Sequence, residues 1–313
     1  MRLIRWLDFI SNQGWVTSTN MGTDATTEWV VGARVVGDLR KVTSGGAAAT
    51  FTYKIYEAIT TVGDDPTVDV GTVSPGVGTN WKEVGSVNEW AWANETTADQ
   101  ATNATTLQVV LTPGSIINAV GFANLSSATS VNITLNDPVE GEVHNEDYDL
   151  VSDSGINNWY DFYFEETVQW QEWAVFDLPP YSAGTCTITL SVASGTVGVG
   201  AIIAGQALTI GDTQYGAASY GITDYTTNDY IPELGRVVSV EGNFIDEANF
   251  SIYVGNSKFS AVKQQLRTLR NTPIYWSPDA DRTGSGIFGK YRDFEMTIQG
   301  PSLTLCNLEV AGL

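Results

Sequence analysis

The residues best suited to chemistry are acidic side chains that stand beside aromatic ones in the middle of the chain. The acids are Asp161, Glu165, Glu166 and Glu172, and the neighbouring aromatic residues are Trp159, Tyr160, Trp170 and Trp173. Glycoside hydrolysis needs two carboxyl groups across a cleft, one with a raised pKa, and aromatic rings can stack on the sugar. The alternative is a sandwich strand with its aromatic side chains in the core and its acids in solvent, and we favour that interpretation.

Other catalytic arrangements have little support in the sequence. The single histidine, His144, would have to serve any Ser-His-Asp or Cys-His arrangement, and its nearest serine, Ser152, follows an acidic run. No phosphate-binding loop and no zinc-protease motif is present. Cys186 and Cys306 each lie in an apolar, strand-like context, which predicts two buried free thiols. We therefore expect a protein that is not an enzyme and needs no cofactor.

An acidic segment at residues 137–149 has the oxygen atoms that calcium prefers. Its candidate metal ligands are Glu140, Glu142, Asp147 and Asp149. Calcium takes about six to eight oxygen ligands, and this segment supplies them without the spacing of a dedicated calcium motif. We favour a solvated acidic loop and keep Ca²⁺ as the alternative.

A second aromatic pattern, in residues 27–92, is the candidate glycan-binding surface. Its members are Trp29, Tyr56, Trp81, Trp90 and Trp92. Exposed rings of this kind stack on sugars, whereas buried ones would form the core of a small domain with few other large apolar residues. The sequence leaves these two interpretations open.

The elements that must position these residues are expected to be mainly β, in several domains. We expect an N-terminal β strand and aromatic segment at 1–103, an acidic jelly-roll β-sandwich at 104–205, and a C-terminal α+β docking domain at 206–313. Short strands separated by turn residues carry this prediction.

Particular elements follow from the local periodicity. Within the sandwich, strands are predicted at 159–164, 168–176, 186–192 and 197–204. One helix is predicted near residues 258–270, because Phe259, Val262, Leu266 and Leu269 recur at helical spacing.

Charge is distributed unevenly along the chain. The net charge is −21, yet residues 83–235 contain no Lys or Arg and hold 20 of the 36 acids, by count from the sequence. Such a module should repel nucleic acids and anionic membranes, and it suits cations, neutral glycans or a basic protein face. The alternative, which the sequence leaves open, is that the charge is an adaptation to salty surroundings. No apolar stretch is long enough to insert into a membrane, and the first ten residues do not resemble a secretory signal.

One stretch has a distinctive pattern, made of Trp29-Val-Val-Gly32-Ala-Arg-Val35, Lys54-Ile-Tyr56-Glu57-Ala58, Asp65-Pro66 and Trp81. This pattern resembles the small, aromatic, chitin-binding type of carbohydrate module that is often appended to secreted hydrolases and phage tail proteins. A long insertion, residues 37–50, precedes the strand that carries Tyr56.

A second set of short motifs is spread over most of the chain. These are Met1-Arg-Leu-Ile-Arg5, Asn88-Glu-Trp-Ala-Trp92, Asn136-Asp137-Pro138, Asp153-Ser-Gly-Ile-Asn-Asn-Trp-Tyr-Asp161, Asp177-Leu-Pro-Pro-Tyr181, Gln214-Tyr-Gly216 and Cys306-Asn-Leu-Glu-Val-Ala-Gly-Leu313. Through these motifs the chain is similar to a family of uncharacterised tailed-bacteriophage virion proteins. The resemblance implies a structural role at the tail tip or in tail-fibre attachment, and it implies no catalytic residues.

We therefore expect a virion protein made in the host cytoplasm, with other tail proteins as partners. Such proteins associate through symmetric interfaces, so a homo-oligomer, a trimer or hexamer, is expected. It would contact host surface glycan if the aromatic segment is exposed. The alternative is a receptor-binding protein whose function is glycan recognition, followed by a glycosidase.

Overall fold

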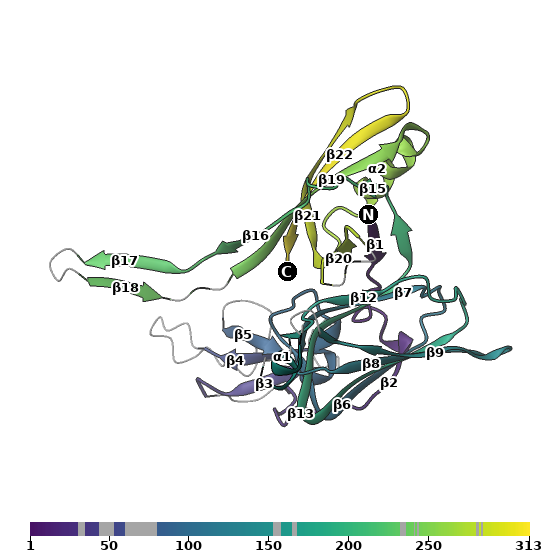
Figure 1. The fold of residues 1–313 in the computed structure, drawn as a ribbon. Helices are drawn as coiled ribbons and strands as arrows, with labels where there is room; N and C mark the ends of the chain where they lie inside the picture. The colour runs from purple at the N-terminus through teal and green to yellow at the C-terminus, as the bar shows by residue number, and fades with distance from the viewer. Residues whose placement is uncertain are drawn as a thin grey trace.

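The protein is built almost entirely of antiparallel strands. The structure, a computed structural model, describes residues 1–30, 35–43, 53–59, 80–152, 158–164, 168–231, 236–240, 242, 244–279, 282 and 284–313. Figure 1 shows two β layers stacked on each other, with a long hairpin that projects sideways from the upper one. The prediction of a mainly β protein is confirmed.

The lower layer is a seven-stranded sheet, called here the central sheet. Its strands are β2 (Val16–Thr19), β6 (Ala101–Leu111), β7 (Ala119–Ser126), β8 (Ser130–Asp137), β9 (Gly141–Asp149), β12 (Trp173–Val175) and β13 (Thr185–Gly205). Alternate residues of its strands enter one apolar core, as Leu107, Val109 and Leu111 do on β6. The short helix η1 (Gln13–Trp15) leads into β2.

Strand β13 is one strand of 21 residues, so the prediction of two strands there was wrong. Its pairing with β6 shifts register between Ser191 and Thr196, where Gly195 has φ 104°, and Thr105 on β6 has φ 60° at the same level. On its other side β13 pairs first with β8 and then with β7, and residues 127–129 join these two. Because a bulge bends a strand without ending it, the long strand continues through a local break in its ladder.

The upper layer, called here the C-terminal sheet, has eight strands. These are β14 (Ala207–Thr209), β1 (Arg2–Arg5), β20 (Ile274–Ser277), β21 (Ile287–Ile298), β22 (Leu303–Gly312), β19 (Phe244–Gly255), β15 (Asp212–Thr213) and β16 (Ser219–Asp224). The first strand of the chain therefore lies between two strands from its last third, paired with β14 and β20.

The predicted helix is confirmed as α2 (Phe259–Thr268), which follows the single turn η4 (Asn256–Lys258). Its buried side chains, Val262 and Leu266, join Leu269 in the core of the C-terminal sheet. The helix therefore covers one face of that sheet, and its remaining residues stay at the surface.

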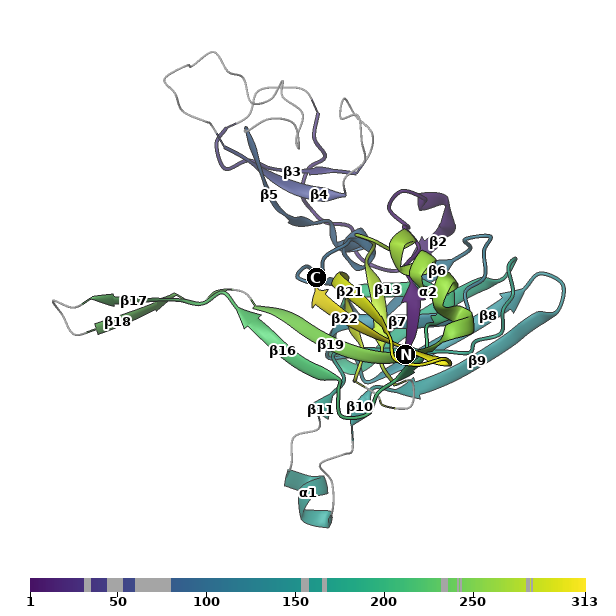
Figure 2. The same ribbon diagram turned by 90° about the horizontal axis from the view of Figure 1, so that it is seen from above.

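Smaller elements extend from the two layers. A three-stranded sheet, called here the small sheet, contains β3 (Leu39–Val42), β4 (Lys54–Ala58) and β5 (Trp81–Ser86), and the helix η3 (Asn88–Ala93) follows it. A two-stranded stem, β10 (Val151–Ser152) and β11 (Val168–Gln169), leads to the short helix α1 (Trp159–Phe164). Figure 2 shows the small sheet and α1 projecting in opposite directions.

The prediction of a strand at 159–164 was wrong, because these residues form α1. Asn158 accepts a hydrogen bond from the backbone N–H of Tyr160 at 2.8 Å, which supports a helical start. The predicted strand 168–176 is divided into β11 and β12, with Trp170 between them.

A third apolar cluster joins the two layers. Ile4 and Tyr275 of the C-terminal sheet pack against Ala119 and Ile203 of the central sheet. Close backbone approach helps here, since a Cβ at Gly121 would lie only 3.1 Å from the ring of Tyr275. The layers therefore pack tightly against each other at this junction.

Candidate functional sites

The aromatic candidates of the small sheet are buried. Trp29, Tyr56 and Trp81 are 4%, 5% and 7% exposed, and they form a core with Val42 and Ala58. The indole N–H of Trp29 has no hydrogen-bond partner among the described residues. These three rings therefore build the small sheet instead of presenting a stacking face.

Trp90 and Trp92 belong to a different cluster. They lie on η3 with nearly parallel rings, their centroids 6.3 Å apart, and Trp92 also contacts Phe9 in the central core. Trp90 is half-buried and packs on Tyr53, whose ring centroid lies 4.6 Å away. The structure thus does not bring the five candidate glycan-binding residues onto one surface.

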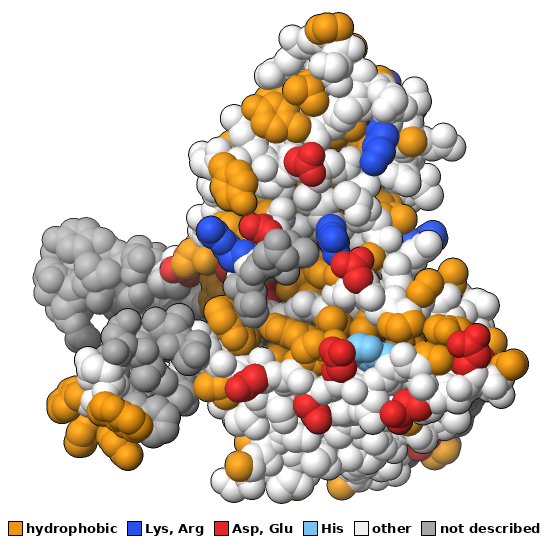
Figure 3. All heavy atoms as spheres, turned by 45° about the vertical axis from the view of Figure 1, so that its right-hand side comes forward, with side chains coloured by type: hydrophobic (Ala, Val, Ile, Leu, Met, Phe, Trp, Pro, Cys, Tyr) orange, Lys and Arg blue, Asp and Glu red, His pale blue; other side chains and the backbone are white. Residues whose placement is uncertain are grey.

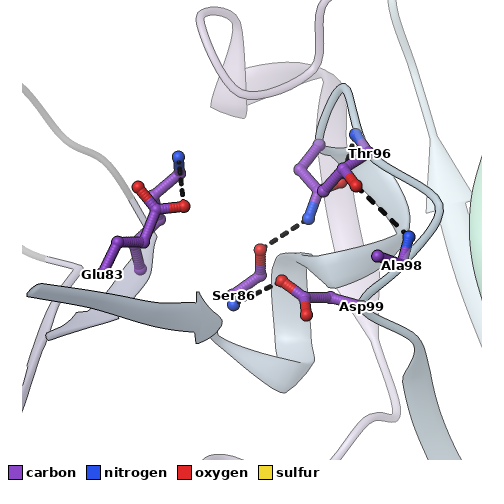
Figure 4. A network of polar contacts seen from close by, with 7 residues as sticks. Glu83, Ser86, Thr96, Ala98 and Asp99 are labelled. Carbon is purple, nitrogen blue, oxygen red and sulfur yellow. Dashed lines mark hydrogen bonds and ion pairs between the residues drawn. The ribbon is translucent and has the colours of Figure 1, made fainter. Parts of the chain in front are cut away.

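A polar network holds the small sheet to the central one (Figure 4). The backbone N–H of Ser86 donates to Asp99 Oδ2 at 2.8 Å, and the Asn94 amide donates to Ser86 Oγ at 2.6 Å. Thr96 closes the turn by donating its backbone N–H to Asn94 and accepting one from Ala98. These hydrogen bonds therefore account for the polar side chains between the small sheet and the central sheet.

The candidate calcium ligands lie on β9 and in the turn before it, so most of the segment expected as a solvated acidic loop is a strand. Each carboxylate accepts a hydrogen bond from a different donor. Glu140 accepts from Tyr181 Oη, Glu142 from the Asn145 amide, Asp147 from the Asn132 amide and Asp149 from the Val151 N–H. Within the described ranges, no three acidic, histidine or cysteine side chains are placed to share a metal ion.

The single histidine lies in a small polar group on β9. The hydroxyl of Tyr148 donates to Glu146 at 2.8 Å and lies 3.3 Å from His144 Nε2. Desolvation and the neighbouring Glu146 carboxylate raise the pKa of Tyr148 above its usual range. Figure 3 shows the histidine in an apolar band at the waist between the layers, with acids close by. No serine or cysteine nucleophile is bonded to it in the part of the chain that is described.

The aromatic side chains of α1 face solvent, contrary to the interpretation that they fill a core. Trp159, Tyr160, Tyr163 and Phe164 are 78%, 68%, 70% and 71% exposed. The rings lie in two contacting pairs, with Trp159 stacked on Tyr163 and Tyr160 tilted against Phe164. Of the acids expected here, the side chain of Asp161 and all of Glu165 and Glu166 lie outside the described residues.

Glu172 lies at the junction of the two layers. Burial raises its pKa to about 8, and repulsion from Asp246 on β19 adds to the shift. Burial is the main cause that raises the pKa values of Tyr220 and Tyr275, and repulsion from Glu172 raises them further. Nearby, the ring of Trp170 packs against Gly284, where a Cβ would lie 2.6 Å from the indole.

This carboxyl pair does not have the electrostatic pattern of a glycosidase. The pKa of Asp246 is also raised by burial, so both acids shift in the same direction. A general acid and a nucleophile or base need pKa values that are pushed apart. Proximity alone therefore does not support hydrolysis at this junction.

The most prominent surface feature, the projecting hairpin, was not predicted from the sequence. Its described parts are β16, β17 (Thr227–Ile231), β18 (Arg236–Val240) and the first half of β19. Exposed large apolar residues line it: Tyr220, Ile222, Tyr225, Val240 and Phe244. Their alternation with polar residues is ordinary for a strand, and only the fold reveals that each stays more than half exposed.

Comparison with family models, curated proteins and solved structures finds no match to this chain. The fold and surfaces define a layered antiparallel β protein with three projecting elements, which are the hairpin, the small sheet and α1. No helix in the described ranges has the length and apolar character to cross a bilayer.

Proposed function

We propose that this protein is a structural component of a tailed-bacteriophage virion, at the tail tip or in tail-fibre attachment. The observation that carries the proposal is the projecting hairpin, whose five large apolar side chains are 53–65% exposed. Soluble proteins seldom leave such a surface uncovered unless another protein packs on it. The resemblance to tail proteins supplies the assembly in which the packing would occur.

The proposal includes a three-part organisation. The central sheet would be a jelly-roll sandwich, the small sheet an appended module, and the C-terminal sheet with α2 the part that docks onto other tail proteins. The antiparallel order of the central sheet and the tight junction between the layers are compatible with this division.

Antibody labelling of purified phage particles tests the assignment. We expect label at the end of the tail that lies away from the capsid, and the protein in the mass spectrum of washed particles. Absence of the protein from particles that are complete and infectious would overturn it.

Glycan recognition is the second candidate function, and α1 is the observation that favours it. Exposed aromatic rings stack on sugar faces, and α1 presents four of them. Replacing Trp159 and Tyr163 with alanine should abolish binding to host surface polysaccharide, since both side chains are mostly exposed. Tyr215→Ala is the matched control, because Tyr215 is 88% exposed at a distant site. Equal binding by all three proteins would exclude this role for α1.

A further inference from the structure

The projecting hairpin, called here the arm, is a two-stranded ribbon that leaves the C-terminal sheet. Six residue pairs join β16 to β19, from Ser219↔Asn249 to Asp224↔Phe244, and β17 pairs with β18 beyond them. Along β19 toward the tip of the arm, Glu247 is the last residue that pairs with β22. Among the described residues no third strand accompanies the arm beyond that point.

One face of the arm mixes exposed apolar side chains with acidic ones. Tyr220, at the base of the arm, and Ile222 are two residues apart on β16 and therefore point to the same face. Phe244 joins that face by register, and Asp224 and Asp246 lie on it opposite Phe244 and Ile222, between the three apolar side chains. These three side chains are 53%, 65% and 57% exposed.

An isolated ribbon of this kind needs a covering surface. Two-stranded hairpins are at best marginally stable in water, and unpaired strand edges invite further contacts. The five exposed apolar side chains of the arm, of which three share one face, together offer roughly 500 Å² of apolar area, taking about 100 Å² for each. With an equal area on a partner this reaches about 1,000 Å², the lower size of a specific interface.

Charge indicates which surface could receive the arm. In sequence, the described strands of the arm contain Asp224, Asp229, Asp246 and Glu247 against one base, Arg236. Glu247 is already paired with Arg292 of β21, so the other three acids carry the negative charge of the arm. The central sheet should not attract an acidic element, because residues 83–235, which form most of that sheet, contain no base. The receiving surface should therefore be basic.

Helix α2 provides the basic surface. Lys258, Lys263, Arg267 and Arg270 lie on or next to it, and residues 248–278 contain no acid. None of these four bases forms an ion pair within the described part of the chain, whereas Arg2, Arg40, Lys54, Lys290 and Arg292 all do. A groove of about 320 Å³ runs beside the helix, lined in part by Leu208, Ala261 and Leu269 with Arg5.

We propose that the arm of one copy packs on the α2 surface of a second copy of this chain. Figures 1 and 2 show arm and helix well apart, so a single copy does not make this contact itself. Arm and helix are different surfaces, so the contact is heterologous and repeats around a ring or along a stack. The inference deepens the proposed assembly role by assigning the self-contact to two named surfaces.

The purified full-length chain tests the inference by its molar mass in light scattering. We expect an oligomer for the unaltered protein and a monomer for the double variant Ile222→Asp, Phe244→Asp. Val139→Asp is the control, because Val139 is 91% exposed in the turn between β8 and β9. A monomeric unaltered protein, or an arm variant that still assembles, would overturn the inference.

A second pair of variants tests the receiving surface. Arg267→Glu with Arg270→Glu should weaken self-association at least about tenfold and remove most of its salt dependence. Lys82→Glu, an exposed change outside α2, should leave both unaltered. If only the arm variant dissociates, the arm contributes to the contact but does not pack on α2, and the assignment of the receiving surface is overturned. Circular dichroism checks that each variant folds, and these measurements need no virion, so they fail independently of the tail assignment.

Discussion

Glu172, just before β12, and Asp246, on β19, repel each other across the junction between the two layers. The two carboxyl groups come from strands that lie far apart in the sequence and in different sheets. Tyr220, on β16, and Tyr275, on β20, are the other titratable groups that face Glu172, and Arg282 lies close to Tyr220. Docking of the layers therefore places an acid where its charge is poorly solvated.

The folded protein should lose stability as the pH rises, because Glu172 at this junction must then ionise. The pKa of Glu172 is about 8 in the folded protein against 4.5 for an ordinary glutamate. Folding therefore favours the protonated form, and the penalty for ionisation grows from about pH 4.5 to pH 8 and is complete above that. After a discount for partial exposure, Glu172→Gln should raise the free energy of unfolding at pH 9 by on the order of 2 kcal/mol.

Urea titrations at pH 4 and pH 9 provide the measurement. The two proteins should have similar unfolding free energies at pH 4, where the glutamate is protonated in both states. Glu295→Gln, at an exposed position on β21, is the control and should change neither value. A loss of stability in Glu172→Gln at pH 9 would contradict the prediction.

The two thiols should be inert in the folded protein. Burial raises the pKa of Cys186 to about 12 and that of Cys306 to about 11, and each lies in a different apolar core. Since the thiolate is the reactive form, a disulfide reagent at pH 8 should label neither until the protein unfolds. Two labels per folded chain, with an unchanged circular dichroism spectrum, would be incompatible with these positions.

Gly205 should be intolerant of any side chain. A Cβ at this end of β13 would collide with the carbonyl oxygen of Arg5, where β1 runs beside the central sheet. Because that atom is backbone and cannot rotate away, Gly205→Ala should cost on the order of 2 kcal/mol and lower the melting temperature. Gly22→Ala has open space around its Cβ and serves as the control. Equal melting temperatures would mean that the layers do not approach each other here.

Trp81 should stabilise the fold and should not contact a ligand directly. Its ring is 7% exposed in the core of the small sheet, so Trp81→Ala should destabilise that sheet by about 3 kcal/mol or more. Trp159→Ala, at 78% exposure, should leave stability unchanged. Hydrogen exchange of β4 and β5 in the two variants distinguishes these effects, and fast exchange in Trp159→Ala alone would reverse the assignment.

The sequence by itself determined the kind of most elements, with α1 as an exception. Alternation and turn residues predict a mainly β chain, and the spacing of Val262, Leu266 and Leu269 predicts α2, because these patterns depend only on neighbours along the chain. The burial of Cys186 and Cys306 followed in the same way from their apolar contexts. The uneven charge is also a property of the sequence alone.

Tertiary structure decided what those elements contact. The aromatic side chains of Trp81 and Trp159 are alike in chemistry, yet one lies in a core and the other in solvent, since burial depends on what packs above each element. For the same reason the raised pKa of Glu172 could not be predicted from the sequence, because it arises only where the start of β12 meets a strand from the other sheet. The bare arm, too, is a matter of missing neighbours, because local alternation cannot tell a covered strand from an uncovered one.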